Sequence, residues 1–203
     1  MLQDIISIDV RVLNSIMSSV NQSNGILVNL ITFFSDFGVF FVALSLVALW
    51  LYWTKKKDDE FKKTALIIFY TIAYSFLLYV IINKWFPVRP RPETVSSIRP
   101  LIDHLPDNSF PSWHAIFAWA AFAWFMFFWP NTAYLAVLAI LSALMFYSRI
   151  ASWVHYPGDI LIGLLLGLLF WFCFYRLQKI PKVKKALDKT NVKIIKLVSY
   201  IKL

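Results

Sequence analysis

Long apolar runs dominate this sequence and restrict the folds that it can adopt. The first run extends from Ile26 to Trp53 and is interrupted only at Ser35-Asp36. A helix needs roughly 20 apolar residues to cross a bilayer, so this run predicts one transmembrane helix. We interpret Ser35-Asp36, with Gly38 after it, as a helix cap near the interface, where the helix breaks and restarts. Of the 203 residues, 60% are hydrophobic, which indicates an integral membrane protein.

Further apolar runs predict four more transmembrane helices. Apolar residues among the first twenty recur at steps of three and four, which predicts an amphipathic helix that lies on the membrane. A first helix packed on the bundle is an alternative that the sequence leaves open. The expected fold class is therefore all-α, an integral membrane helical bundle with about five transmembrane helices and an N-terminal amphipathic helix. The four further runs are Thr64 to Asn83, Ser112 to Trp129, Ala133 to Tyr147 and Asp159 to Tyr175.

Lysines predict the orientation and the domain organisation. Lys55-Lys56-Lys57 follow the first apolar run, and the positive-inside rule places them in the cytoplasm. We divide the chain into a membrane-embedded domain, residues 1–175, and a basic amphipathic cytoplasmic tail, residues 176–203. Counting the crossings then places Lys84 to Pro111 and Ser148 to Asp159 together on the extracytoplasmic side of the cell membrane.

The net charge of +9 is compatible with nucleic-acid binding, but the lysines gather beside apolar segments. No zinc-finger, RRM or helix-turn-helix pattern occurs, so we expect membrane phospholipids as partners and no nucleic acid. The single cysteine, Cys173, lies in an apolar run and cannot form an intrachain disulfide. The sequence leaves the oligomeric state open.

Ionisable residues concentrate in three polar segments between the apolar runs. Charged side chains beside a membrane are costly unless they have a function. Cationic donors with two histidines, and without a carboxylate cluster, favour an anionic phosphate over a metal ion. Ser112 stands where a helix begins, so its hydroxyl and the following N–H groups can also hold an anion. The segments contain Lys84, Arg89 and Arg91; Ser109 to His114; and Arg149, His155 and Asp159.

The order and spacing of these residues resemble the three-part signature of the type 2 phosphatidic acid phosphatase family, which includes vanadium haloperoxidases. One difference is Trp113, which stands where the family usually has glycine and is expected to reshape the pocket. The matching parts are Lys84 with Arg91-Pro92, then Pro111-Ser112-Trp113-His114, then Ser148-Arg149 with His155 and Asp159.

The resemblance implies that His155 attacks phosphorus and forms a phosphohistidine, while Asp159 bonds its other ring nitrogen. His114 protonates the leaving oxygen and later takes a proton from water. We therefore expect turnover to have a bell-shaped pH dependence. We expect the reaction to need no cofactor and no metal. Arg89 is a candidate second phosphate contact. The phosphoryl oxygens are held by Lys84, Arg91, Ser112, Trp113 and Arg149.

The short chain and its Arg-Pro-Arg-Pro loop are similar to the bacterial branch that converts undecaprenyl diphosphate to the monophosphate, and we predict that function. Phosphatidic acid, phosphatidylglycerol phosphate or lipid A phosphate are alternative substrates. A non-enzymatic protein that binds phospholipid headgroups is an alternative of another class. Vanadate-dependent halide oxidation is disfavoured, because a membrane-embedded site suits it poorly.

Overall fold

Helices account for all the regular structure in the part of the chain described by the computed structural model, which is residues 2–21, 25–85, 89–96, 99–103, 108–128 and 131–200. The predicted all-α fold class is confirmed. The helices are α1 (Leu2–Asn21), α2 (Gly25–Lys56), α3 (Asp59–Trp85), α4 (Pro92–Ser96), α5 (Trp113–Phe128), α6 (Thr132–Ala151), α7 (Pro157–Leu177) and α8 (Pro181–Tyr200).

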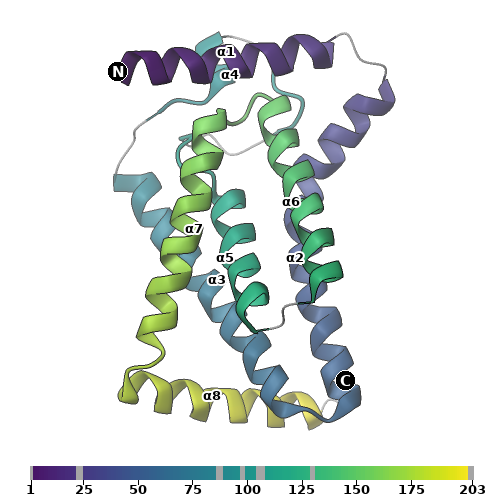
Figure 1. The fold of residues 1–203 in the computed structure, drawn as a ribbon, viewed down its shortest axis with the longest axis vertical. Helices are drawn as coiled ribbons and strands as arrows, with labels where there is room; N and C mark the ends of the chain where they lie inside the picture. The colour runs from purple at the N-terminus through teal and green to yellow at the C-terminus, as the bar shows by residue number, and fades with distance from the viewer. Residues whose placement is uncertain are drawn as a thin grey trace.

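The helices α2, α3, α5, α6 and α7 form the membrane bundle (Figure 1). The helices α2, α3, α6 and α7 are long and apolar enough to cross a membrane, and α5 is a shorter apolar helix. This agrees with the expected number of about five. The helix boundaries differ from the predicted runs by a few residues, and two of these differences bear on the polar segments: α6 continues to Ala151 and so includes Ser148-Arg149, and α7 begins at Pro157. The loop predicted after Arg91 also contains the short helix α4.

The predicted break at Ser35-Asp36 is wrong, because α2 is continuous through these residues. Ser35 is fully buried, and Gly38 lies against Met145 of α6. A Cβ atom on Gly38 would come within 2.5 Å of Met145 Cγ. The glycine therefore allows two helices to approach closely, and it does not interrupt one.

Two glycines bring α7 against α5, the helix at the centre of the bundle. A Cβ atom on Gly163 would lie 2.7 Å from the Ser112 carbonyl oxygen, and one on Gly167 would lie 2.6 Å from the Ile116 carbonyl oxygen. Small residues four apart let membrane helices pack backbone to backbone. This contact sets the start of α5 beside the start of α7, where the second and third polar segments lie.

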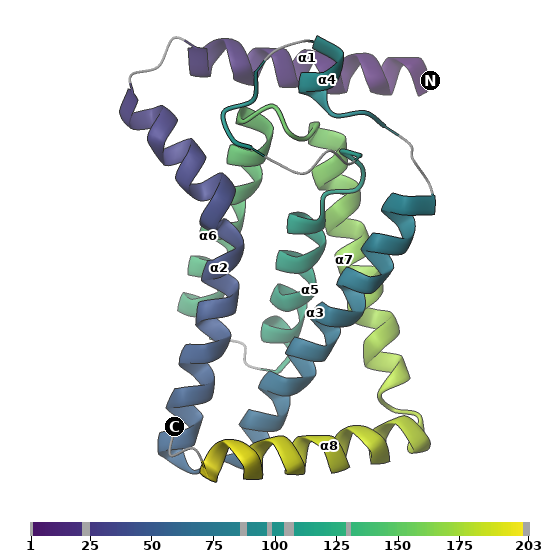
Figure 2. The ribbon, with the colours of Figure 1, turned by 180° about the vertical axis from the view of Figure 1, so that it is seen from behind.

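The helix α1 lies across one end of the bundle, as both views show (Figures 1 and 2). Its apolar stripe, Leu13 and Met17, packs on Trp153 and Tyr156 in the connection between α6 and α7. α1 therefore packs on the bundle, which is the second of the two arrangements considered from the sequence. α1 covers the end at which the polar segments meet.

The helix α8 lies across the opposite end of the bundle (Figure 2). It is attached to α3 by the Tyr70 hydroxyl, which donates a hydrogen bond of 2.9 Å to Asn191 Oδ1. Asn191 is almost completely buried. The basic tail thus packs on the bundle along part of its length.

Candidate active site

The three polar segments meet at the α1 end of the bundle. Arg91, in the first segment, donates a hydrogen bond from Nη1 to the Val154 carbonyl at 2.6 Å. The N–H of Ser112 donates to the Asp159 carbonyl at 3.2 Å, which joins the second segment to the third. Segments separated by up to 63 positions are thereby joined by one side-chain-to-backbone bond and one backbone-to-backbone bond.

His155 is held in one tautomer by a backbone carbonyl. Its Nδ1 lies 2.8 Å from the carbonyl oxygen of Ser109, which can only accept a hydrogen bond. The proton is therefore on Nδ1, and Nε2 keeps its lone pair. Nε2 is buried and has no hydrogen-bond partner within the described residues. His155 thus presents an unprotonated nitrogen in a closed site, as a nucleophile requires.

The surroundings of His155 keep the ring neutral. Burial is the main cause that lowers the pKa of His155 to about 4, and the charges of Arg149 and Arg91 act in the same direction. The Asp159 carboxylate opposes this effect. A neutral imidazole is the form that can attack phosphorus.

Asp159 stands close to His155 but is bonded elsewhere. Its Oδ2 accepts a hydrogen bond of 2.8 Å from the N–H of Tyr156 and lies 3.6 Å from His155 Nδ1. From the sequence, Asp159 was expected to bond the second ring nitrogen of His155. In the structure this nitrogen, Nδ1, bonds to the Ser109 carbonyl instead. The carboxylate fixes the turn that carries His155 into α7.

From the sequence, Ser109 was placed in the second polar segment without a role, and Asn83 was not singled out. The N–H of Ser109 donates to the Arg89 carbonyl at 3.1 Å. Asn83, at the end of α3, donates from Nδ2 to the carbonyls of Asn108 and Phe110 at 3.3 and 3.2 Å. These bonds hold in place the carbonyl that orients His155. Ser109 acts through its backbone, so no side-chain pattern could have indicated it.

His114 and Ser112 face His155 from the start of α5. The ring centroids of the two histidines are 6.4 Å apart. Among the described residues, His114 Nδ1 and Ser112 Oγ are buried without a hydrogen-bond partner, as is His155 Nε2. Buried polar atoms are rarely left unpaired, and each such atom calls for an explanation. A bound anion between α5 and the α6–α7 connection would satisfy the donors among them.

Arg149 adds a second buried guanidinium beside Arg91. It lies in the last turn of α6, and its Nη1 is 3.4 Å from both the carbonyl and the hydroxyl oxygen of Ser35 on α2. Ser35 therefore anchors a predicted site residue, a role that the sequence reasoning missed. Arg91 is 3% exposed and Arg149 is 5% exposed, so both charges are largely withdrawn from water.

Lys84 and Arg89 are placed differently from the other cations. Lys84 is exposed at the end of α3 and forms no hydrogen bond or ion pair within the described part of the chain. Arg89 forms an ion pair with Asp9 of α1, and its guanidinium lies 3.3 Å from the centroid of the Tyr156 ring. The structure thus does not bring Lys84 to the cluster, and it gives Arg89 a carboxylate partner.

Trp113 packs within an aromatic cluster. Its ring centroid is 4.0 Å from that of His114, and it meets Phe76 of α3 edge to face at 6.2 Å. The large side chain is therefore accommodated between α5 and α3, where it supports one face of the His114 ring. Phosphate binding by Trp113 stays a prediction.

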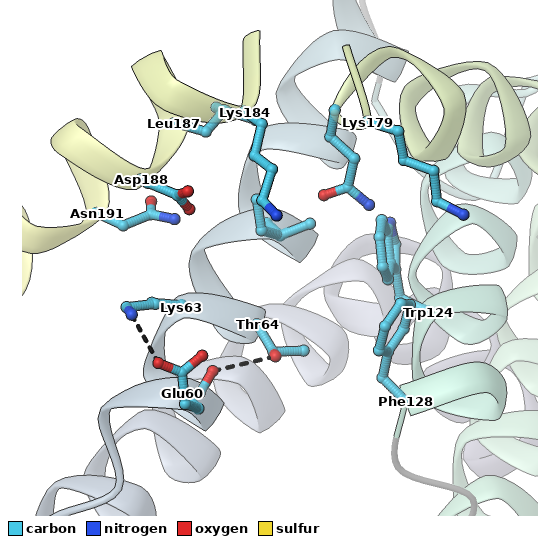
Figure 3. Close-up of a pocket in the computed structure, with 12 residues that line it drawn as sticks. Glu60, Lys63, Thr64, Trp124, Phe128, Lys179, Lys184, Leu187, Asp188 and Asn191 are labelled. Atoms are coloured by element: carbon cyan, nitrogen blue, oxygen red, sulfur yellow. Dashed lines mark hydrogen bonds and ion pairs between the residues drawn. The ribbon is translucent and has the colours of Figure 1, made fainter. Parts of the chain in front are cut away.

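A cavity of about 390 Å³ lies at the other end of the molecule, between α3, α5 and α8 (Figure 3). Lysines and carboxylates surround it, with Trp124 and Phe128 on its apolar side. None of the predicted site residues lines this cavity. The histidine cluster, and not this cavity, is therefore the candidate active site.

Known proteins resemble this chain in sequence. A family model described as the PAP2 superfamily matches residues 63–181. The undecaprenyl-diphosphatase BcrC of Bacillus subtilis (strain 168) is 30% identical over 162 residues, covering 77% of this chain and 77% of the relative. The bacitracin transport permease protein BcrC of Bacillus licheniformis is 31% identical over 159 residues, covering 77% of this chain and 74% of the relative.

Two solved structures share the fold. LpxE of Aquifex aeolicus has a TM-score of 0.63 and 21% identity, covering 82% of this chain and 94% of LpxE. The PAP2-type phosphatidylglycerolphosphate phosphatase of Bacillus subtilis also has a TM-score of 0.63, with 20% identity and 87% of each chain covered.

Proposed function

Because the chain belongs to the PAP2 superfamily, and is thereby a membrane phosphatase, we propose that it hydrolyses undecaprenyl diphosphate to the monophosphate without a metal. The family assignment confirms the resemblance seen in the sequence. The substrate, the reaction path and the orientation in the membrane are the further steps of this proposal.

The observation that carries the proposed mechanism is the state of His155. Its Nδ1 is bonded to the Ser109 carbonyl, and its buried Nε2 has no hydrogen-bond partner within the described residues. In the first step Nε2 attacks the terminal phosphorus, an N–P bond forms, and the P–O bond to the lipid monophosphate breaks. In this proposal His114 protonates the departing oxygen.

Water completes the reaction in a second step. His114, now neutral, takes a proton from water, whose oxygen attacks phosphorus while the N–P bond breaks. The products are inorganic phosphate and the regenerated His155. Ser112 contributes its hydroxyl and the N-terminal end of α5 to the phosphoryl oxygens in both steps.

Arginines supply the positive charge that a metal would otherwise provide. Arg91 and Arg149 are buried beside His155, and a guanidinium can pair with two phosphoryl oxygens at once. Charge stabilisation of this kind is the main requirement of phosphoryl transfer. Within the described residues no group of three or more His, Cys, Asp or Glu side chains is placed to hold a metal ion.

A diphosphate is supported by two observations. The Bacillus subtilis relative is named as an undecaprenyl-diphosphatase and covers most of this chain. Arg89 lies 3.7 Å from Asp159 Oδ1, so a further cation stands at the edge of the catalytic cluster. We assign the site to the extracytoplasmic face, with α8 in the cytoplasm, on the strength of the lysine distribution.

Phosphatidylglycerol phosphate and lipid A phosphate remain alternative substrates, with phosphatidic acid beside them. The fold neighbours include a phosphatidylglycerolphosphate phosphatase. A protein that only binds phospholipid headgroups would share the buried arginines but would release no phosphate. These readings differ in what they predict for turnover.

The deciding experiment measures phosphate release by the purified full-length protein in detergent with EDTA. Undecaprenyl diphosphate and phosphatidic acid are compared in parallel, with His155→Ala as the inactive variant and Ser142→Ala, a buried serine of α6, as the matched control. We expect higher kcat/KM for the diphosphate, loss in His155→Ala and little change in Ser142→Ala. Equal rates would contradict the diphosphate preference. Loss of turnover with EDTA would contradict metal independence.

A further inference from the structure

The helix α1 places one buried carboxylate at the edge of the catalytic cluster. Asp9 lies on the face of α1 that packs on the bundle, and it is 9% exposed. A charged group is costly to bury unless it is paired and hydrogen-bonded. Its partners therefore show what this part of α1 is for.

Asp9 binds two segments of the site with its two oxygens. Oδ1 accepts a hydrogen bond of 2.8 Å from the N–H of Gly158, in the first turn of α7. Oδ2 forms the ion pair with Arg89. First-turn N–H groups have no partner within their own helix, and they favour a negative charge. A residue on a separate helix thus caps the helix that carries Asp159.

The fit around Asp9 is close. A Cβ atom on Gly158 would lie 3.0 Å from Asp9 Oδ2 and 3.4 Å from Asp9 Cγ. The absence of a side chain at Gly158 therefore lets the carboxylate reach the backbone.

Both partners of Asp9 are connected to His155, one along the chain and the other through hydrogen bonds. Gly158 lies three residues after His155, in the turn that the Tyr156–Asp159 hydrogen bond closes. Arg89 accepts, through its carbonyl, the N–H of Ser109, and Ser109 in turn accepts the Nδ1 proton of His155. Asp9 therefore ties together the segment that carries the nucleophile and the segment that orients it.

We propose that Asp9 is a positioning residue for the phosphatase reaction and that α1, through Asp9, helps to hold the active site in its geometry. This inference rests on the proposed function. Asp9 holds Gly158 and Arg89 in register, so that Nε2 of His155 points at the phosphoryl group. It also balances the charge of Arg89, which lies 3.7 Å from Asp159.

The charge balance predicts opposite effects for the two members of the ion pair. Removal of the Asp9 charge leaves Arg89 unbalanced and disfavours protonation of His155. Removal of the Arg89 charge leaves two carboxylates unbalanced and favours protonation. The ionisable groups that face His155 are Asp159 on α7, Arg149 on α6, His114 on α5, and Arg91 and Arg89 in the first polar segment, with Asp9 of α1 behind Arg89.

The test uses full-length protein in detergent and measures kcat and KM for undecaprenyl diphosphate over a range of pH. Asp9→Asn keeps an oxygen for Gly158 but removes the charge, and Asp9→Glu keeps the charge. We expect Asp9→Asn to lower kcat by about tenfold, with a smaller effect on KM, and Asp9→Glu to recover part of the loss. The acid limb of kcat/KM should move to lower pH in Asp9→Asn and to higher pH in Arg89→Gln.

Two control variants separate positioning from folding. Leu13→Ala weakens the packing of α1 without touching Asp9, so it should lower Tm and leave the acid limb in place. Arg11→Gln removes an exposed charge from the same helix and should resemble the wild type. The proposal is overturned if Asp9→Asn has the same kcat and the same acid limb as Arg11→Gln. It is also overturned if Asp9→Asn and Leu13→Ala lose the same kcat at equal Tm while the acid limb of Asp9→Asn stays in place. Wild-type protein without turnover would instead contradict the proposed function.

Discussion

At the scale of single residues, the environment of His155 determines the expected pH dependence. Burial lowers its pKa to about 4, so the folded protein keeps this ring neutral where an ordinary histidine titrates. We expect kcat/KM for undecaprenyl diphosphate to be maintained as the pH falls from about 6.5 and to be lost only near pH 4. Over the same interval the fold becomes less stable, because unfolded chains bind a proton at His155 that the folded protein does not. Tm is therefore recorded with the rates, and an acid limb near 6.5 at unchanged Tm would contradict the prediction.

Ser112 gives a second prediction at this scale. Its hydroxyl is buried without a hydrogen-bond partner within the described residues, so it is available to a phosphoryl oxygen. We expect Ser112→Ala to lower kcat/KM about tenfold to a hundredfold with little change in Tm, because the lost bond forms only with substrate. Phosphate release and thermal unfolding measure the two effects. A fall in Tm that accounts for the whole loss would assign Ser112 to folding alone.

At the scale of secondary structure, the contact between α5 and α7 depends on glycine. Gly163→Ala would bring a Cβ atom to 2.7 Å from the Ser112 carbonyl and press α7 away from the start of α5. We expect a loss of about 1 to 3 kcal/mol of stability, together with lower kcat, since the same contact sets Ser112 beside Asp159. Gly25→Ala is the matched control, because nothing lies within 4 Å of its added methyl group. Equal Tm and kcat in the two variants would show that the close approach is unimportant.

The elements also show how far the sequence could predict the molecule. Apolar runs indicated the helices, because a bilayer demands long uninterrupted segments. Ser148-Arg149 was assigned to a loop because its residues are polar, but Arg149 lies in α6 and its Nη1 bonds to Ser35 of α2, which is far away in the sequence. The three-part motif identified the histidines and arginines. Ser109, Asn83 and Asp9 contribute through backbone bonds or distant ion pairs, which leave no local pattern.

At the scale of the whole molecule, α1 and α4 lie at one end of the bundle and α8 lies at the opposite end (Figure 1). The proposed orientation places α4 outside the cell and the α2–α3 connection inside. In a Cys173→Ser background, we expect Val95→Cys, which is exposed on α4, to react with an impermeant thiol reagent in intact cells. Lys57→Cys should react only after the membrane is permeabilised. The reverse pattern would invert the orientation.

The short length of α5 has a consequence for how the two reactants meet. With 16 residues it spans about 24 Å, less than the hydrocarbon core, and its N-terminal end lies recessed below the ends of α6 and α7 (Figure 2). Ser112 and His114, at this end of α5, are buried. A lipid need not rise out of its leaflet to bring its phosphate there. In the proposed reaction, water is therefore the reactant that has to travel to the buried site for the second step.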